Sequence, residues 1–352
     1  LSFRPIFQSL INPYLNYLIR GLELKQYSKI FLSSIIIRLI IVIPLTIYFK
    51  NYWALVIGSL SATAIKTIMS YFFIDYKPKL EIQFIKLKKL FSFSIWILIS
   101  RFYQIIFKNF PYLILANNVN ISNIGGYRVS EQIGTIFDNI YKKFSSKVIL
   151  PSLAEVNRSQ IDKSSIYENN FILLISSSLY LTLPSFYFSE ILIYTILGEK
   201  WLFIDILLKS FIILGGLLLF LTYLVSLSIS IGFPKIDAIS KIILSPFLIY
   251  FIYASTSEIE IIKILISIIL FNIAFLIFFT KRYLNVNYLK IFYGVFFYTY
   301  PLFISFIIIL SINNINYFSL IIFIATIILI TILNKLFNQK NLILDILSLI
   351  KP

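Results

Sequence analysis

This chain of 352 residues contains no cysteine and no histidine. The absence of cysteine excludes disulfide bonds, and the absence of histidine removes the commonest zinc ligand together with histidine-based acid–base catalysis. Charged residues make up only 13% of the chain, whereas a soluble globular protein has about 25%. So large a shortage of charge excludes an ordinary soluble domain.

Apolar residues take the place of the missing charges and make up 59% of the chain. The apolar runs are too long and too continuous for the alternating strands of a β-barrel. A transmembrane helix needs roughly 20 apolar residues, and about eleven runs meet this length. The sequence therefore predicts an all-α, polytopic membrane protein with spans at 5–20, 30–48, 52–73, 91–116, 124–150, 168–197, 204–231, 236–254, 259–280, 289–311 and 316–334.

Basic residues outnumber acidic ones by 31 to 15, which gives a formal net charge of +16. If the first span runs from outside to inside, most of the basic residues fall in the inner connections. Lys235 and Lys241 are among them, whereas the outer connections hold Lys50 and Lys200. The positive-inside rule thus accounts for the surplus, and we expect no nucleic-acid partner. The most basic connection, 75–90, is the best candidate for a boundary between two helical lobes.

Charged residues also occur within the predicted spans, where each costs at least a few kcal/mol unless it faces protein or water. Residues that recur at steps of three, four and seven share one side of a helix. Two such stripes are Arg128, Glu131, Thr135, Asp138 and Lys142 in the span 124–150, and Ser94, Arg101, Gln104 and Lys108 in the span 91–116.

Two further cations lie in neighbouring spans, Lys66 on one face with Ser59, Thr63 and Ser70, and Arg38 with Ser34. These residues permit two interpretations. They are helix-packing ion pairs and snorkelling ends, or they line a water-filled, cationic cavity that accepts an anionic substrate. The second interpretation is favoured because five cations outnumber the acids. The expected substrate-binding residues are Arg38, Lys66, Arg101, Gln104, Lys108 and Arg128, opposed by Glu131 and Asp138.

Nothing in the sequence has the pattern of a catalytic site, a metal site or a cofactor site. There is no glycine-rich phosphate loop before a Lys-Ser or Lys-Thr pair, so this chain is not expected to hydrolyse ATP. The glycine pairs at 125–126 and 215–216 favour close helix approach over ligand binding. We therefore expect neither an enzyme nor a cofactor.

Five blocks follow one another in the order and spacing of a known family. They are "LINPYLNYLIRGLELKQYSK", "YWALVIGSL", "IGGYRVSEQIG", "VILPSLAEV" and "LGEKW". Together they resemble the bacterial polysaccharide flippases, the Wzx-type, polysaccharide-transporter branch of the MOP superfamily, over residues 1 to about 235. The chain departs from the pattern in "FKNFPYLIL", which lacks an acidic residue that family members often carry there, and in the Gly before Gly126.

The resemblance implies twelve to fourteen helices in two lobes around a central cavity, as in MATE-like bundles. It implies an N-terminal truncation of about three helices. The domains would be 1–74, the remainder of the first lobe; 75–90, a basic cytoplasmic inter-lobe segment; 91–280, a six-helix second lobe; and 281–352, two extra helices with a basic tail.

The resemblance also implies a function at the bacterial inner membrane. Such proteins move undecaprenyl-pyrophosphate-linked oligosaccharide, the repeat unit of O-antigen, capsule or exopolysaccharide, to the outer leaflet. The cationic residues would then balance the pyrophosphate, and Glu131 and Asp138 would tune the field or couple an ion. Expected partners are the lipid-linked oligosaccharide, membrane lipids, and a polysaccharide polymerase with other assembly proteins.

Three other functions stay open at this point. A MATE-like drug or cation antiporter would have an acidic cavity, whereas the one expected here is basic. A membrane enzyme, such as an O-antigen polymerase or a lipid-sugar glycosyltransferase, would carry a large outer loop or acidic catalytic loop residues. A structural membrane scaffold would have no need of a cationic interior.

Overall fold

The computed structural model describes residues 4–21, 23–51, 53–74, 76–78, 84–158, 163–284, 287–310 and 317–336. Over these ranges the chain is helical and has no strand, which confirms the all-α prediction. Parts of two predicted features, the inter-lobe segment at 75 and 79–83 and the tail at 337–352, lie outside the described residues.

The chain forms two compact units, Leu1–Lys89 with Ser146–Glu155, and Leu90–Ser145 with Val156–Pro352. The predicted division into 1–74, 75–90, 91–280 and 281–352 stays a prediction. Unit 1 contains α1 (Arg4–Ser9), α2 (Tyr14–Arg20), α3 (Leu24–Phe49), α4 (Trp53–Phe72) and most of η1 (Ser145–Ile149), a π-helical turn, and α8 (Leu150–Arg158).

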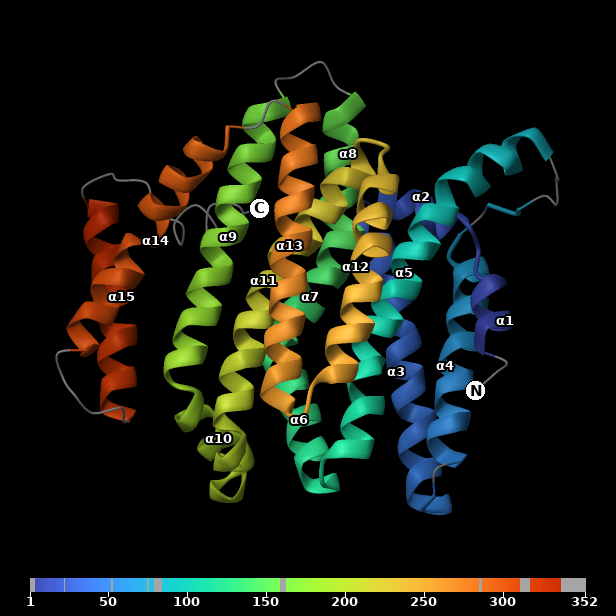
Figure 1. The fold of residues 1–352 in the computed structure, drawn as a ribbon. Coiled ribbons are helices and arrows are strands. Elements are labelled where there is room, and N and C mark those ends of the chain that lie inside the picture. Colours follow the sequence, from blue (N-terminus) through green and yellow to red (C-terminus); the bar gives the residue numbers. More distant parts are fainter. Residues whose placement is uncertain are drawn as a thin grey trace. The chain divides into compact units, whose positions relative to one another are not determined.

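Helices α3 and α4 pair as a hairpin in unit 1 (Figure 1). Lys50, which follows α3, adopts the left-handed conformation with φ of 48°. The Oδ1 atom of Asn51 accepts a hydrogen bond from the backbone N–H of Trp53 at 3.0 Å. An asparagine that binds the backbone two residues later is typical of turns. This bond stabilises the short turn between α3 and α4.

The predicted span 5–20 is divided at Asn12 and Pro13 into α1 and α2. Asn12 is completely buried. Its backbone N–H donates to the Oγ of Ser70 on α4 at 3.0 Å, and its side-chain amide donates to the carbonyl of Tyr76 at 2.8 Å. A broken helix is tolerated at membrane depth where neighbouring groups bond the freed backbone, and Asn12 receives that support from elsewhere in unit 1.

The carbonyl of Phe7, on the other side of this break, also has a partner in α4. The hydroxyl of Thr67 donates to it at 2.8 Å. The same hydroxyl lies 3.0 Å from the carbonyl of Thr63, one turn earlier on α4. Side-chain hydroxyls of one helix thus complete the backbone hydrogen bonding of the other.

Unit 2 is built around α11, which packs against α6, α7, α9, α12 and α13 (Figure 1). Its elements are most of α5 (Phe84–Asn118), then α6 (Ile121–Gly134), α7 (Ile136–Phe144), α9 (Lys163–Tyr187), α10 (Ser189–Leu197), η2 (Glu199–Ile204), α11 (Asp205–Ser230), α12 (Pro234–Ala254), α13 (Glu258–Leu284), α14 (Tyr288–Leu310) and α15 (Tyr317–Leu336).

Helices α6 and α11 cross where two glycines let their backbones touch. A Cβ atom at Gly215 would lie 2.3 Å from the carbonyl oxygen of Gly134. A Cβ at Gly134 would lie 2.5 Å from the Cβ of Phe211. Both distances are far below van der Waals contact. The predicted role of the pair 215–216 in close helix approach is therefore confirmed at Gly215.

The prediction of close helix approach at the glycine pair 125–126 holds for one of the two residues only. A Cβ at Gly126 would lie 3.0 Å from Ile204 and from Phe203 of η2, so a close approach is confirmed there. A Cβ at Gly125 would meet no atom within 4 Å. The prediction is wrong for Gly125, because this face of α6 has no neighbour at that position.

Helix α14 is attached to α9 by a buried acid. Glu168 is 4% exposed, and its two oxygens accept from the backbone N–H of Asn287 at 2.8 Å and from the Nζ of Lys290 at 2.7 Å. The first of these bonds satisfies a backbone donor just before α14 begins. One carboxylate thus fixes the start of α14 against the core of unit 2.

Seven helices in the described residues are long and apolar enough to cross a membrane, by length and composition. Two shorter apolar helices, Val56–Phe72 and Ser319–Ile328, fall in the predicted spans 52–73 and 316–334. The predicted spans 5–20 and 124–150 are each divided into shorter pieces. The protein is therefore a multi-pass membrane protein. The seven helices are Lys25–Phe49, Leu90–Asn118, Ser164–Tyr187, Glu199–Ser230, Pro234–Ala254, Glu258–Tyr283 and Leu289–Ile308.

The substitution Gly215→Ala is expected to destabilise unit 2 by about 1–3 kcal/mol, because the added methyl collides with a backbone oxygen that has no rotamer to change. Gly125→Ala is the matched control, since open space surrounds it and alanine is the better helix former. The melting temperature of the purified protein in detergent checks this. Equal melting temperatures for the two variants would contradict the described crossing.

Candidate functional site

The two charged stripes of unit 2 lie against each other, with α5 antiparallel to α6 and α7. Tyr112 of α5 contacts Arg128 and Glu131 of α6. One turn earlier on α5, Lys108 lies within electrostatic range of Asp138 on α7. The structure thus brings together four of the residues that the sequence singled out, Lys108, Arg128, Glu131 and Asp138.

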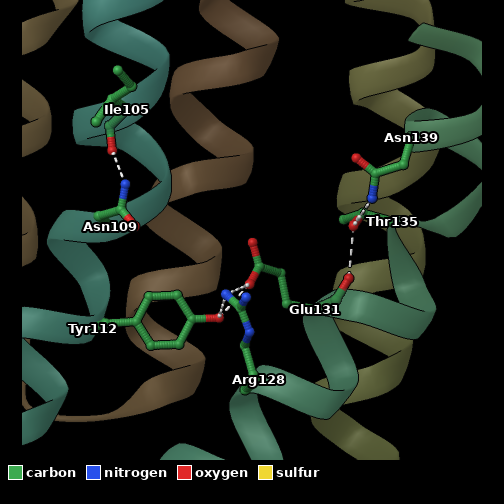
Figure 2. A network of polar contacts seen from close by, with 7 residues as sticks. All are labelled: Ile105, Asn109, Tyr112, Arg128, Glu131, Thr135 and Asn139. Atoms are coloured by element: carbon green, nitrogen blue, oxygen red, sulfur yellow. Dashed lines mark hydrogen bonds and ion pairs between the residues drawn. The ribbon is translucent and has the colours of Figure 1, made fainter. Parts of the chain in front are cut away.

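The side of α5, α6 and α7 that carries the two stripes is called the cationic face below. At one end of it, Tyr112, Arg128 and Glu131 form a three-residue network, which Figure 2 shows from close by. The hydroxyl of Tyr112 donates to Oε2 of Glu131. Nη1 of Arg128 lies 3.3 Å from that hydroxyl and 3.4 Å from the same carboxylate oxygen. The guanidinium carbon of Arg128 also lies 5.4 Å from the centre of the Tyr112 ring, a cation–π distance.

Arg128 keeps much of its hydrogen-bonding capacity in this network. Its side chain is 47% exposed, whereas that of Glu131 is 16% exposed. One of its three guanidinium nitrogens makes both contacts. A guanidinium has five N–H donors, so several stay available to an anion. The sequence missed Tyr112, although it stands four residues beyond Lys108 on the same stripe.

The predicted span 124–150 bends at Thr135, between α6 and α7. The hydroxyl of Thr135 donates to the carbonyl of Glu131 at 2.7 Å, and the side-chain amide of Asn139 donates to Thr135 Oγ1 at 3.3 Å (Figure 2). A threonine that binds the carbonyl four residues earlier bends a helix. The stripe therefore continues across the bend, from Glu131 to Asp138.

Asp138 lies further along the same face, on α7, and is 1% exposed. Its Oδ2 accepts from the Nζ of Lys142 at 2.5 Å, and its Oδ1 accepts from the hydroxyl of Thr222 on α11 at 3.2 Å. The side chain of Lys142 is 42% exposed. The acid is therefore buried and fully bonded, while its cation stays accessible.

Arg101 belongs to the stripe on α5, two turns before Lys108. It is exposed, and its Nη1 donates to the amide oxygen of the neighbouring Gln104 at 3.2 Å. Both Arg101 and Lys142 lie within electrostatic range of Lys241 on α12. Lys108, also exposed, forms no ion pair with any residue in the described ranges. Two cations of the α5 stripe thus have no acidic partner of their own.

Charge counting placed Lys235 and Lys241 in an inner connection, and for Lys241 this is wrong. Lys241 lies in the second turn of α12 and is 2% exposed. Its charge is tolerated there because Asp237, one turn earlier, pairs with it. That spacing within the predicted span 236–254 was the available signal. Lys235 is exposed and lies 5.8 Å from the ring centre of Trp96 on α5.

The remaining two predicted site residues belong to unit 1. Arg38 is exposed on α3, and Lys66 is partly buried on α4 with its Nζ 6.0 Å from the ring centre of Phe31. Lys147, which the sequence did not single out, lies 4.6 Å from the ring of Tyr27 and 4.7 Å from that of Phe31. That Arg38 and Lys66 share a site with the cations of unit 2 stays a prediction.

Such a face can bind anions, because its cations are exposed, whereas Asp138 is buried, Glu131 is only 16% exposed, and both acids are already bonded. Among the described residues, no three acidic side chains gather where they could hold a metal ion. The class is therefore a multi-pass helical membrane protein with a cationic face. A family model described as polysaccharide biosynthesis protein matches residues 1–205.

This match covers more than half of the 352 residues, and the chain belongs to the polysaccharide biosynthesis protein family. It includes both stripes of the candidate site and ends at the first residue of α11. Neither the curated proteins nor the solved structures contain a match to this chain.

Removal of Lys142 is expected to destabilise the protein more than removal of its partner. Lys142→Ala leaves the buried Asp138 carboxylate without a counter-charge, which costs about 3 kcal/mol. Asp138→Asn leaves Lys142 free to turn toward water and costs about 1 kcal/mol. Thermal unfolding in detergent should rank the variants in this order.

The double variant D138N/K142A provides the control for this comparison. It contains no unpaired buried charge, so it should melt above K142A alone. A double variant that melts below both single variants would show that the pair stabilises the protein by another route than charge neutralisation.

Proposed function

We propose that this chain is a flippase of the bacterial inner membrane that translocates undecaprenyl-pyrophosphate-linked oligosaccharide to the outer leaflet. Family membership supports a role in polysaccharide biosynthesis. The observation that carries the finer proposal is the cationic face of unit 2, where Arg101, Lys108 and Arg128 follow one another along α5 and α6.

The spacing of these cations suits the passage of a charged group. Arg101 and Lys108 are seven residues apart on α5, about 10 Å along the axis at 1.5 Å per residue. Tyr112, which holds Arg128, stands about 6 Å further along. Together they extend over about half of a hydrocarbon core that is roughly 30 Å thick. An anion moving along this face would always have a cation near it.

The surplus of positive charge specifies the kind of substrate. Arg128 and Lys142 each have an acidic partner, but Arg101 and Lys108 have none among the described residues, so this face carries net positive charge. A pyrophosphate carries several negative charges, and arginine binds phosphate oxygens with two parallel N–H donors. Arg101 and Arg128 would bind the pyrophosphate, while Lys108 would act as a point charge between them.

The surroundings of this face suggest where the other parts of the substrate would lie. The polyprenyl tail would stay in the bilayer, because the outer faces of the helices are apolar. Alternating access, as in other secondary transporters, would carry the headgroup across. Glu131 and Asp138 would set the field along the path. Membrane lipids, a polysaccharide polymerase and other assembly proteins are the proposed partners, and neither a cofactor nor a catalytic step is invoked.

The test deletes the full-length gene in its own host and restores it as wild type, Arg101→Ala or Arg128→Ala. Lipid-linked oligosaccharide on the outer leaflet is quantified in spheroplasts with a membrane-impermeant label. Loss of one charge-assisted hydrogen bond is worth about 1.5–3 kcal/mol, so each variant should lower outward transfer by about 10- to 100-fold. Lys263→Ala, an exposed lysine on α13, is the control and should restore wild-type transfer.

The same experiment separates the proposal from its rivals. If repeat units cross normally in the deletion strain while polymer is absent, the flippase proposal is wrong and a polymerase takes its place. If both arginine variants transfer at the wild-type rate while the deletion blocks transfer, the protein is a flippase that does not use this face. Immunoblots of the membrane fraction control for insertion.

A further inference from the structure

The hydroxyl of Tyr112 and the guanidinium of Arg128 share one carboxylate oxygen, Oε2 of Glu131 (Figure 2). The tyrosine hydroxyl donates a hydrogen bond to this atom. Nη1 of Arg128 lies 3.4 Å from the same atom, beyond the roughly 2.7–2.9 Å of a charge-assisted hydrogen bond. Glu131 is therefore bonded mainly by a neutral donor and only loosely by its cation.

The other pairs of an acid and a base within one helix of unit 2 are closer. The three in the described residues join an aspartate to the lysine four positions later, with N–O distances of 2.5, 2.6 and 2.6 Å. Thr222 donates to Asp138 and Ser189 donates to Asp205, but each hydroxyl uses the oxygen that the lysine leaves free. At Glu131 the hydroxyl instead takes the oxygen that faces the cation, and the pair is longer.

The ring of Tyr112 is held in place independently of its hydroxyl. It meets the ring of Tyr127 edge-on, with 5.3 Å between the ring centres, and Tyr127 meets Phe211 of α11 at 4.9 Å. Tyr127 is 2% exposed, so the support behind Tyr112 belongs to the core of unit 2. The same ring lies 5.4 Å from the guanidinium carbon of Arg128. The ring thus positions Arg128, while the hydroxyl determines how Glu131 is bonded.

This division determines how easily Arg128 can leave Glu131. The side chain of Glu131 is 16% exposed. A mostly buried carboxylate that loses its last partner is strongly destabilised. With the Tyr112 hydroxyl in place, the carboxylate keeps a donor when Arg128 turns away. The side chain of Arg128 is 47% exposed, so an anion from outside can reach it.

We propose that Tyr112 is a positioning residue for the anion site: its hydroxyl bonds Glu131 and thereby leaves Arg128 available to the pyrophosphate of the substrate. The inference rests on the proposed function and deepens it. Without the hydroxyl, Arg128 would be the remaining side-chain partner of Glu131 among the described residues. It would then close into an ion pair with two parallel hydrogen bonds, and its charge would be lost to the substrate. No proton is transferred, because Tyr112 stays the donor throughout.

The substitution Tyr112→Phe tests this, because it removes the hydroxyl and keeps the ring with its contacts to Tyr127 and Arg128. Two quantities are measured on the full-length protein in nanodiscs. The first is the affinity for undecaprenyl pyrophosphate. The second is the rate at which phenylglyoxal modifies Arg128 without lipid, followed by mass spectrometry of the peptide that contains it. Y112F should bind the lipid about 3- to 10-fold more weakly, the worth of one hydrogen bond, and its Arg128 should react more slowly by a similar factor.

A second substitution distinguishes positioning from a merely structural role. Glu131→Gln removes the carboxylate, so Arg128 is free with or without the tyrosine hydroxyl. E131Q and Y112F/E131Q should therefore bind the lipid equally, and at least as tightly as wild type, since a negative charge beside the anion is gone. Damage to packing by Y112F would persist in the double variant.

Tyr103→Phe is the matched control on the same helix. Tyr103 is 7% exposed, and its hydroxyl has no hydrogen-bond partner among the described residues. Y103F removes the same atom from α5 without changing the bonding of any carboxylate in this network. It should match wild type in both measurements.

The outcomes separate this inference from the function on which it rests. If wild type does not bind the lipid, both are overturned. If wild type binds and Y112F matches it in affinity and in Arg128 reactivity, only the inference is overturned. A weakened Y112F that E131Q fails to rescue also overturns the inference alone, since the hydroxyl would then act by another route. Weaker binding and slower modification in Y112F, both abolished by E131Q and absent in Y103F, support it.

Discussion

Charge neutralisation within a single helix is the constraint on which unit 2 depends. Glu131, Asp138, Asp205 and Asp237 each pair with a basic residue three or four positions away on the same or the adjoining helical turn. Such a pair forms as soon as its helix forms, so the helix can enter an apolar environment before it meets its neighbours. Glu168, which pairs with Lys290 of another helix, departs from this scheme and ties α14 to the core.

Local pairing also determines which charges of unit 2 are left without an acidic partner among the described residues. Among the described residues of unit 2, Glu131, Asp138 and Asp237 each pair with a cation three or four residues away, and α5 contains no acid. Arg101 and Lys108 form no ion pair with an acid in the part of the chain that the structure describes. The arrangement differs from a surface rich in exposed salt bridges, where both signs are accessible and neither dominates. The positive charge of this face thus depends on how the acids are placed, as much as on the number of cations.

Composition and periodicity predicted the helical class, most of the spans and both stripes of unit 2. Those features depend on local sequence alone, since apolar length and a step of three or four residues fix them. The break at Asn12 was not predicted, because its hydrogen bonds involve Ser70 and Tyr76, which only the folded chain brings near. The bend at Thr135 was also not predicted, although its hydrogen bonds to Glu131 and Asn139 are local. Lys241 was misassigned because a count of charges ignores whether a carboxylate stands one turn away. Tyr112 was missed because its aromatic ring reads as part of an apolar span.

The break between α1 and α2 differs in kind from a flexible joint. Asn12 and Phe7, on either side of it, bond to hydroxyls of α4, so straightening or further bending would sacrifice several hydrogen bonds at once. The bend is therefore expected to be rigid, because hydrogen bonds to α4 fix the chain on both sides of it. A displacement of α1 would therefore also displace α2 and α4. In unit 1 these three helices are therefore expected to move together as one rigid body.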